Sequence, residues 1–410
     1  MIYKWLMLKG KKIVLGVTGG IAAYKAAEFV RLLVKAEANV HVVMTRNAQE
    51  FITPLTFQTL TGNPVLTDTF SFFEEKEIGH VALADLAETI VILPATANII
   101  GKIANGIADD FLSTMVMASK APVLICPSMN VNMWENKALQ RNLSTLVERG
   151  YHFVEPGVGE LACHWYGKGR LADLDEVLEK MEDIFSPKDL AGERILVTAG
   201  PTQEPIDPVR FITNHSSGKM GFAVAQVARR RGAEVILIAG PVSLSLPRRD
   251  IEVLRVHTAE EMRKAVLGHL ARCSVLIKAA AVSDYRPKVV HPNKMKKGDA
   301  QLFMDLERTV DILGEAGKQK GNRILVGFAA ETEQLVANAQ KKLKEKHLDL
   351  IIANNVAQPG AGFGHDTNQV KILYANGDVR DLPMMSKEEV ASIILDEVIR
   401  LKQKKPSPEK

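Results

Sequence analysis

Two segments of the sequence combine reactive side chains with glycines. Cys163 lies in the glycine-rich stretch 159–170, where a thiol is accessible, unlike a packing cysteine such as Cys126. Lys294 lies in the basic run 293–297, which has a proline and a glycine beside it and no helical periodicity. A lysine run is usually a solvated surface, but this setting equally favours a flap that clamps phosphate. The two segments indicate thiol chemistry in the first half of the chain and phosphate chemistry in the second.

Small polar residues follow several apolar runs in the first half. The glycine turn at 16–20 opens a helical pattern and suits a phosphate or ring, although a plain tight turn is equally compatible. Its spacing is not G-x-G-x-x-G, so it does not support a dinucleotide site. Thr45, residues 94–98 and residues 127–134 follow three more runs, and we expect one shared crevice rather than three unrelated helix caps. His80 begins an apolar helical stretch, where a lone histidine is more often a surface residue than a base.

The second half carries a loop suited to phosphate. Residues 199–221 are rich in Ser and Gly and open a helix, so their backbone N–H groups are available to an anion. The Gly-Lys pair in this loop lacks a following Ser or Thr, so the loop has no P-loop magnesium ligand, and alone it would be an ordinary connection. Residues 278–287 and 327–332 end two later strands. Lys342 and Lys346 share a helix face, where solvated lysines are the default.

Nine short apolar runs alternate with helical patterns, as buried parallel strands do. The runs lie at residues 12–18, 39–45, 89–93 and 122–126, and at 194–198, 234–238, 275–279, 324–329 and 348–353. Segments such as 21–34 and 222–230 have helical spacing. The alternation predicts the α/β class with two doubly wound, Rossmann-like domains. We also expect an antiparallel hairpin at 369–379 and a last helix ending near Leu401.

The pattern of strands and helices restarts near the middle of the chain. Residues 186–192 are polar and contain a proline and a glycine, which is typical of a linker. A length of 410 residues suggests two or three domains at about 150 residues each. We therefore expect domains at 1–190 and 191–410.

The composition excludes several classes of protein. Hydrophobic residues make up 46% and charged residues 24%, values of an ordinary globular protein. The net charge of +4 is too small to indicate a nucleic-acid partner. The three cysteines form no CxxC pair, which fits a reduced, cytoplasmic protein. The most apolar stretch, 89–100, is shorter than the roughly 20 residues that cross a bilayer, and residues 1–12 lack the features of a signal peptide, so we expect no membrane association.

The first half resembles the flavin-dependent cysteine decarboxylases, and most closely the phosphopantothenoylcysteine decarboxylases. The resemblance covers about 11–185 and rests on GVTGGIAAYKA, His80, PATANIIGKIANGIADD, PSMNVNMW and Cys163 with GKGRL. It implies a flavodoxin-like fold and FMN, with His80 as base, Asn130 as donor to the departing carboxylate and to the substrate, and Cys163 as proton donor. His164 and Trp165 depart from the family pattern, and this departure bears on the conformation of the loop more than on the role of Cys163. The implied FMN contacts are Thr18, Gly20, Thr45, Ala95, Thr96, Ala97 and Asn98.

The second half resembles the phosphopantothenate–cysteine ligases. The resemblance covers about 191–400 and rests on VTAGPTQEPIDPVRFITNHSSGKMG, AAAVSDYRP, the NKMKK run and GFAAETE. It implies that the carboxylate of 4′-phosphopantothenate attacks the α-phosphate of CTP and that the amine of L-cysteine then displaces CMP. Mg²⁺ is expected on the CTP phosphates, with no protein ligands identified. Lys294 is implied in the first step, Asn214 with the acyl intermediate, and Arg210 and Asn214 with substrate. The implied CTP contacts are Lys278, Ala279, Ala280, Asp284, Lys294, Val310, Asp311, Ile312, Leu313, Phe328, Lys342 and Lys346.

The same resemblance implies a homo-oligomer. Decarboxylases of this kind form trimers with flavin sites between subunits, sometimes assembled into dodecamers, and the ligase half pairs as a dimer. Two alternatives belong to other classes. A non-catalytic flavin-binding subunit would be expected to lack His80 or Cys163, and both are present. A nicotinamide-dependent oxidoreductase would need the G-x-G-x-x-G turn, which is absent.

Overall fold

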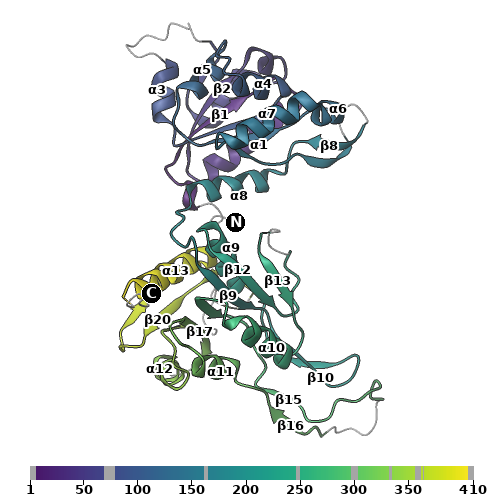
Figure 1. Cartoon of the computed structure of the whole chain (residues 1–410), viewed down its shortest axis with the longest axis vertical. Coiled ribbons are helices and arrows are strands. Elements are labelled where there is room, and N and C mark those ends of the chain that lie inside the picture. The colour runs from purple at the N-terminus through teal and green to yellow at the C-terminus, as the bar shows by residue number, and fades with distance from the viewer. Residues whose placement is uncertain are drawn as a thin grey trace. The chain divides into compact units, whose positions relative to one another are not determined.

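The computed structural model describes residues 6–68, 79–160, 165–245, 250–296, 303–331, 335–355, 362 and 364–404. The chain divides into two compact units, Met1–Ser186 and Pro187–Lys410. The division falls within the segment 186–192 that we expected to be a linker, four residues before the expected boundary at 190. Both units are built on a sheet that is parallel throughout or for the most part, with helices on both faces, so the predicted α/β class is confirmed (Figure 1).

The sheet of the first unit has the strand order β3-β2-β1-β4-β5-β6 and is parallel throughout. Its strands are β1 (Lys12–Val17), β2 (Asn39–Met44), β3 (Val65–Leu66), β4 (Thr89–Ala95), β5 (Val123–Pro127) and β6 (His152–Phe153). The strand β3 is a two-residue addition at one edge of the sheet. The other five strands follow the flavodoxin-like order that we expected. The order reverses between β1 and β4, and the open crevice of such a sheet lies at the carboxyl ends of these two strands.

Helices bury the apolar side chains on both faces of this sheet. One face packs against α1 (Ala23–Lys35), α2 (Pro54–Thr61) and α8 (Leu174–Phe185). The other packs against α3 (Gly79–Leu86), α4 (Ala97–Ala104), α5 (Phe111–Ala118) and α7 (Lys137–Glu148). Successive strand residues point to opposite faces, so Leu15 lies in the first core and Val14 in the second. The short helix α6 (Val131–Glu135) and the antiparallel hairpin of β7 (Gly157–Glu160) and β8 (Tyr166–Arg170) complete the unit with two 3-10 turns, η1 (Leu6–Leu8) and η2 (Arg46–Glu50).

The sheet of the second unit has eight strands in the order β13-β12-β9-β14-β17-β18-β20-β21. Its strands are β9 (Arg194–Ala199), β12 (Glu234–Ala239), β13 (Glu252–Arg255), β14 (Val275–Lys278), β17 (Ile324–Glu331), β18 (Leu350–Asn355), β20 (Val370–Tyr374) and β21 (Val379–Asp381). The first six in the sheet are parallel, β20 pairs antiparallel with β18, and β21 pairs antiparallel with β20. The order reverses between β9 and β14, which places a second crevice at their carboxyl ends.

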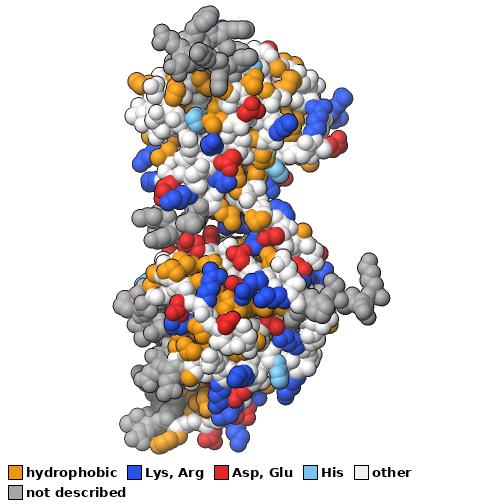
Figure 2. Space-filling view, turned by 90° about the vertical axis from the view of Figure 1, so that its left-hand side faces the viewer, with side chains coloured by type: hydrophobic (Ala, Val, Ile, Leu, Met, Phe, Trp, Pro, Cys, Tyr) orange, Lys and Arg blue, Asp and Glu red, His pale blue; other side chains and the backbone are white. Residues whose placement is uncertain are grey.

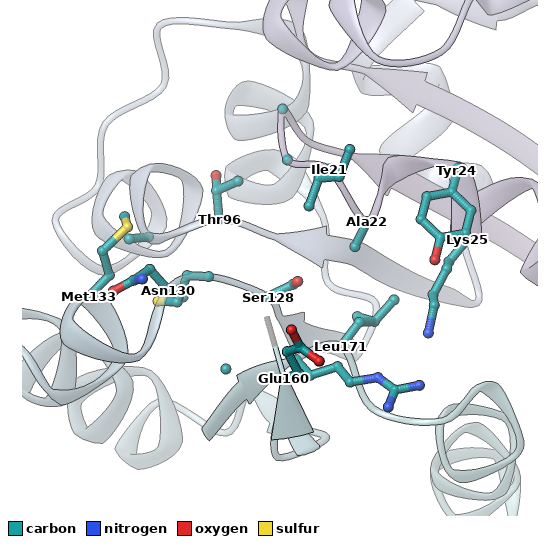
Figure 3. A pocket seen from close by; sticks show the side chains of 16 residues that line it. Ile21, Ala22, Tyr24, Lys25, Thr96, Ser128, Asn130, Met133, Glu160 and Leu171 are labelled. Carbon is teal, nitrogen blue, oxygen red and sulfur yellow. The ribbon is translucent and has the colours of Figure 1, made fainter. Parts of the chain in front are cut away.

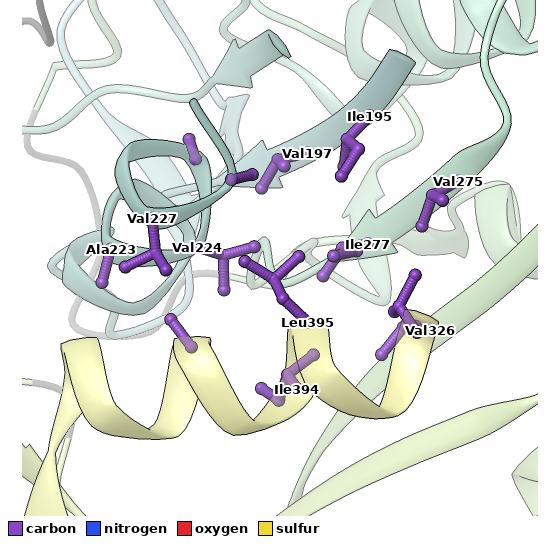
Figure 4. Close-up of a cluster of buried hydrophobic side chains, with 14 of the residues drawn as sticks. Ile195, Val197, Ala223, Val224, Val227, Val275, Ile277, Val326, Ile394 and Leu395 are labelled. Atoms are coloured by element: carbon purple, nitrogen blue, oxygen red, sulfur yellow. The ribbon is translucent and has the colours of Figure 1, made fainter. Parts of the chain in front are cut away.

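Two helices cover one face of this sheet and three cover the other. On the first face, α9 (Lys219–Arg230) packs beside α13 (Lys387–Lys404), and Leu395 of α13 lies among Val224, Ile277 and Val326 (Figure 4). The second face packs against α10 (Ala259–Leu270), α11 (Ile312–Lys318) and α12 (Leu335–Glu345). Three small two-stranded sheets are added: β10 (Gln203–Pro205) with β11 (Phe211–Thr213), β15 (Tyr285–Pro287) with β16 (Leu306–Arg308), and β19 (Thr367–Asn368) with β22 (Met385–Ser386). The β15–β16 pair extends away from the main sheet (Figure 1).

All nine apolar runs form strands, within one or two residues of the expected ends. The hairpin at 369–379 is also confirmed, since β20 and β21 pair across a turn in which Gly377 has φ +95°. The last helix reaches Lys404, three residues beyond the expected end, and 405–410 lie outside the described residues. The small hairpins were not predicted, because their strands are short and half exposed and carry little periodicity.

Lys, Arg, Asp and Glu side chains are interspersed over the face shown in Figure 2, in keeping with the small net charge. Throughout the described ranges, every helix is too short or too polar to traverse a lipid bilayer.

Candidate active sites

A first cavity, of about 590 Å³, opens at the carboxyl ends of β1, β4 and β5. The loops after these three strands meet there, as expected for one shared crevice. The residues around it are Gly19, Gly20, Ile21, Ala22, Tyr24, Lys25, Thr96, Ala97, Ser128, Met129, Asn130, Met133, Glu160, Gly169, Arg170 and Leu171. Tyr24 and Lys25 of α1 lie at the end opposite Asn130 and Met133, and Glu160 enters from the β7–β8 hairpin (Figure 3).

Thr18 joins the two strands that flank the crevice. Its hydroxyl donates to the carbonyl of Pro94 at 2.7 Å and accepts from the backbone N–H of Thr96 at 3.1 Å. The side chain is almost fully buried, so these bonds replace water that the groups have lost. Thr18 therefore fixes the turn that carries Thr96 into the cavity, and it does not line the cavity itself.

The β7–β8 hairpin fixes the loop that carries Asn130. The N–H of Met129 donates to the carbonyl of Gly169 at 3.0 Å. Gly169 has φ +150°, and a Cβ at this position would lie 2.2 Å from the Met129 carbonyl oxygen, so only glycine allows this approach. Asn130 caps α6, with its side-chain oxygen accepting from the N–H of Asn132 at 2.8 Å. This bond fixes which end of the amide is the acceptor and leaves the NH₂ end as the donor side.

The structure brings together part of the predicted FMN set. Gly20, Thr96 and Ala97 line the cavity, and so does Asn130, which was predicted to hold the carboxylate of the substrate. Four other predicted contacts lie outside the lining: Thr18 and Ala95, which are buried, Thr45, whose hydroxyl donates to the Val17 carbonyl at 3.5 Å, and Asn98, which is exposed.

The predicted base, His80, does not line this cavity. His80 lies on α3 with its ring 6.2 Å from that of Phe111. Cys163 and His164 lie outside the described residues, although Glu160, three residues before Cys163, lines the cavity.

Sequence reasoning missed a group of charged and polar lining residues. Glu160 and Arg170 reach the cavity because the hairpin folds back over the sheet, and Lys25 reaches it because α1 starts directly after the glycine turn. Arg170 belongs to the GKGRL string that marked the Cys163 loop, and this string is the sequence signal that could have identified Arg170 as a lining residue.

The lining fits a flavin mononucleotide. Ile21, Met129 and Leu171 offer apolar surface to a planar ring, while Lys25 and Arg170 offer cations to a phosphate. A Cβ on Gly20 would meet only a methyl of Thr96, at 3.5 Å, so its backbone stands open to the cavity.

A second cavity, of about 500 Å³, opens at the carboxyl ends of β9, β14 and β17. Its lining combines the Ser- and Gly-rich loop at the start of α9 with lysines from four elements. The residues are Asn214, His215, Ser216, Ser217, Gly218, Lys219, Met220, Gly221, Lys278, Ala279, Ala280, Ala281, Val282, Asp284, Leu313, Phe328, Ala329, Lys342, Lys346, Leu348, Ile351, Asn354, Gly362, Asn368 and Lys387.

The start of α9 is packed directly on the end of β9. A Cβ on Gly221 would lie 2.6 Å from the Cβ of Ala199, and Gly218 has φ +77°. Both positions need glycine, and together they place the N-terminus of a twelve-residue helix at the cavity wall, where it favours an anion. Asn214 is held beside it by a 2.9 Å hydrogen bond from its amide nitrogen to the Val282 carbonyl.

Lysines make the second cavity cationic. Burial, together with repulsion from the positive charge of Lys346, lowers the pKa of Lys278 to about 8. Lys346 is paired with Asp311 at 2.9 Å. Burial opposes the charge on Asp311, but bonds from Lys346 and from the Gly314 N–H outweigh it and lower the pKa of this carboxyl.

Most of the predicted nucleotide contacts lie together here. The cavity is lined by Lys278, Ala279, Ala280, Asp284, Leu313, Phe328, Lys342 and Lys346 of that set. Asn214, which was predicted to act on the acyl intermediate and the substrate, lines it as well. Val310, Asp311 and Ile312 lie outside the lining: Asp311 caps α11 and Ile312 is buried in the core.

Arg210 and Lys294 are also placed outside the cavity lining. The Arg210 guanidinium is held by the buried carboxylate of Asp207 at 2.5 Å and donates to the Met295 carbonyl at 2.8 Å. Arg210 therefore anchors the segment that carries Lys294, and Lys294 itself is exposed. Among the described residues, no group of three or more His, Cys, Asp or Glu side chains is placed to hold a metal ion.

Comparisons with known proteins identify both units. The family model described as Flavoprotein matches residues 4–186, and the model described as DNA/pantothenate metabolism flavoprotein C-terminal domain matches 190–401. The coenzyme A biosynthesis bifunctional protein CoaBC of Bacillus subtilis is 50% identical, with 96% of this chain and 98% of that protein covered. The chain belongs to the CoaBC family. It is therefore a bifunctional flavoprotein enzyme of coenzyme A biosynthesis, with a ligase and a decarboxylase activity.

Two other relatives extend the comparison. A protein named cysteine/cysteine sulfinic acid decarboxylase, from an unknown prokaryotic organism, is 44% identical over 85% of this chain and 99% of its own length. A crystal structure of the C-terminal domain of a CoaBC protein is 44% identical, covers 53% of this chain and all of its own, and has a TM-score of 0.46.

Proposed function

We propose that the two cavities catalyse consecutive reactions on one pantetheine arm. The cavity of the second unit joins L-cysteine to 4′-phosphopantothenate with CTP, and the cavity of the first unit decarboxylates the product to 4′-phosphopantetheine with FMN. The observation that supports this assignment best is the contrast between the two linings: one holds several lysines at a helix N-terminus, and the other combines apolar surface with Asn130.

The ligase reaction begins with attack on phosphorus. A carboxylate oxygen of 4′-phosphopantothenate bonds to the α-phosphorus of CTP, and the bond to the β-phosphate breaks to release pyrophosphate. Lys278, Lys342 and Lys346 offset the negative charge that builds up on the phosphates, and Mg²⁺ travels with CTP. The amine of cysteine then bonds to the acyl carbon, loses a proton and displaces CMP. Asn214 donates to the acyl oxygen in this second step.

The first unit removes carbon dioxide from the cysteine moiety. Bound FMN supplies reversible oxidation of the thiol-bearing carbon, which allows the charge left by the departing carboxylate to be delocalised. The amide NH₂ of Asn130 holds the carboxylate, since its oxygen is already an acceptor for the Asn132 N–H. His80 takes up a proton and Cys163 returns one, and the reducing cytoplasm keeps that thiol reduced.

Assembly of several chains is part of the proposal. His80 lies outside the cavity lining of its own chain, and Ile21, Tyr24 and Met133 beside the cavity are large and exposed. An exposed apolar surface of this kind is typical of a subunit interface. We expect trimers of the first unit and dimers of the second. A dodecamer can contain both kinds of contact.

Release of pyrophosphate tests the ligase assignment. The purified protein is expected to release pyrophosphate only when 4′-phosphopantothenate and CTP are both present, and to bring a yellow flavin spectrum through purification. Colourless folded protein that cannot take up FMN would contradict the decarboxylase assignment. Pyrophosphate release that does not depend on 4′-phosphopantothenate would contradict the ligase assignment.

A further inference from the structure

One group of charged residues at the second cavity has no role in the reaction as described above. Lys219 is the first residue of α9, Lys387 is the first residue of α13, and both line the cavity. These helices cover one face of the sheet, whereas Lys342 belongs to α12 on the other face and Lys346 directly follows that helix. The cavity therefore receives cations from both sides.

The two ammonium groups are held by the segment 364–368. Lys387 is only 6% exposed and donates to the His365 carbonyl at 2.6 Å. Lys219 donates to the Gly364 carbonyl at 2.8 Å and to the carboxylate of Asp366 at 2.7 Å. The backbone N–H of Lys387 donates to the Asp366 carbonyl at 3.0 Å, and β19 pairs with β22 just beyond. The group is therefore fixed by backbone as well as by side chains.

The local charge balance is positive. A lysine at the first position of a helix meets the positive end of the helix dipole, and here two helices begin at the same cavity. Burial lowers the pKa of Lys387 to about 8, with repulsion from Lys219 as the next cause and attraction to Asp366 opposing it. The acidic residues in the first turn of α13 have other partners: Glu388 pairs with Arg230, and Glu389 caps the helix through Ser386. The side chain of Asp366 is 86% exposed, so water screens its share of the compensation.

We propose that Lys219 and Lys387 bind the pyrophosphate that leaves the nucleoside triphosphate, and that Asp366 competes with pyrophosphate for Lys219. This inference rests on the proposed ligase function. A multiply charged anion supplies the compensation that a single exposed carboxylate does not, and it lies on the side of the cavity away from α12. The competing carboxylate weakens the product complex and so favours release of pyrophosphate.

Binding measurements on the full-length protein test the inference. Calorimetric titrations with inorganic pyrophosphate and Mg²⁺, with CMP, and with 4′-phosphopantothenate are compared for the wild type, Lys387→Met, Lys219→Met and Asp366→Asn. Lys371→Met is the matched control, because Lys371 of β20 makes a similar ion pair with Asp381 of β21, away from the cavity lining. Circular dichroism of each variant, compared with the wild type, reports whether the substituted second unit is folded.

The expected changes have opposite signs. Each lysine variant should bind pyrophosphate about tenfold or more weakly, as expected for the loss of a hydrogen bond to a charged group. Asp366→Asn should bind pyrophosphate about two- to fivefold more tightly, the range for an exposed ion pair. The affinity for CMP should be unchanged in all variants, and Lys371→Met should bind pyrophosphate as the wild type does. A purely structural role would weaken CMP and pyrophosphate binding together, and it predicts no tighter binding in Asp366→Asn.

Several results would overturn the inference. Unchanged pyrophosphate affinity in Lys219→Met would do so even if Lys387→Met fails to fold, because Lys219 is partly exposed. Weaker binding of 4′-phosphopantothenate with unchanged binding of pyrophosphate would assign the lysines to the phosphate of that substrate instead. Failure of the wild type to release pyrophosphate from CTP would contradict the proposed ligase function, whatever the lysine variants show in direct titration with pyrophosphate.

Discussion

At the scale of single residues, the two sites depend on buried polar side chains. Thr18 binds backbone groups of the next strand, and Lys278 holds its charge in a poorly solvated position. Removing a partner of such a group destabilises the folded protein, because a buried donor or acceptor then has a hydrogen bond neither to water nor to protein. Their contribution can therefore be measured one at a time.

Replacing Thr18 with valine should loosen the turn that carries Thr96. Valine has the same shape but leaves the Pro94 carbonyl and the Thr96 N–H without this partner, at a cost of about 1–3 kcal/mol. The backbone N–H of Thr96 should exchange with deuterium faster, and FMN should bind more weakly. Thr18→Ser keeps the hydroxyl and should behave as the wild type. Equal exchange rates at Thr96 in the valine and serine variants would contradict this role.

The affinity for CTP should fall as the pH rises through 8. The pKa of Lys278 is about 8 in the folded protein, below the ordinary value of 10.5, so the ammonium is charged at pH 7 and loses its proton at moderately alkaline pH. Between pH 8 and 10.5, Lys278 is protonated in the unfolded chain but largely neutral in the folded protein. The free energy of unfolding therefore rises with pH in this range, while nucleotide binding becomes weaker.

Titration calorimetry between pH 7 and 9 measures this effect. In Lys278→Met the fall in CTP affinity should be smaller, and the remainder should reflect Lys387, whose pKa is also about 8. An identical pH profile in wild type and Lys278→Met would show that Lys278 does not meet the phosphates.

At the scale of elements, the strands and their ends were predictable and the additions were not. Buried parallel strands leave apolar runs in the sequence, so the crevices at their carboxyl ends could be placed. The β7–β8 hairpin carries no such pattern, so Glu160 and Arg170 were missed as lining residues. The sequence also could not show that Arg210 would be held by Asp207, since an arginine near a phosphate loop suits a ligand equally well.

Replacing Gly169 with alanine should displace the loop that carries Asn130. The new Cβ would lie 2.2 Å from the Met129 carbonyl oxygen, so β8 and that loop must separate. We expect loss of decarboxylase activity with ligation retained. Gly157→Ala in the same hairpin is the control, because its nearest contact would be an ordinary 3.9 Å. Decarboxylase rates measured for both variants decide the matter, and equal rates would contradict a role for this close approach.

At the scale of the whole molecule, each unit has hydrophobic cores of its own on both faces of its sheet. The segment after the division belongs to the second unit. Leu190 is fully buried in the core beside α9, and the carboxylate of Asp189 pairs with the buried Arg231 at 2.6 Å. The second unit therefore begins before the polar segment ends.

A fragment of residues 187–410 should fold and ligate without the first unit. A fragment of 193–410 should be less stable by at least about 2 kcal/mol, since it lacks the buried side chain of Leu190 and one of the two carboxylates that pair with Arg231, keeping only that of Asp396. Urea denaturation of the two fragments, followed by circular dichroism, measures the difference. Equal midpoints would show that residues 187–192 add nothing to the second unit.

The central claim is that one chain carries two separate active sites, and analysis of the products by mass spectrometry tests it most directly. With 4′-phosphopantothenate, cysteine, CTP and Mg²⁺, the wild type should form 4′-phosphopantetheine, CMP, pyrophosphate and carbon dioxide. Cys163→Ser should still ligate but stall after loss of carbon dioxide. Lys294 is exposed and outside the cavity lining, but the family resemblance implies it in the first ligase step, so Lys294→Gln should ligate nothing yet decarboxylate supplied 4′-phosphopantothenoylcysteine. Loss of both activities in either folded variant, or release of carbon dioxide from cysteine without CTP, would contradict the account.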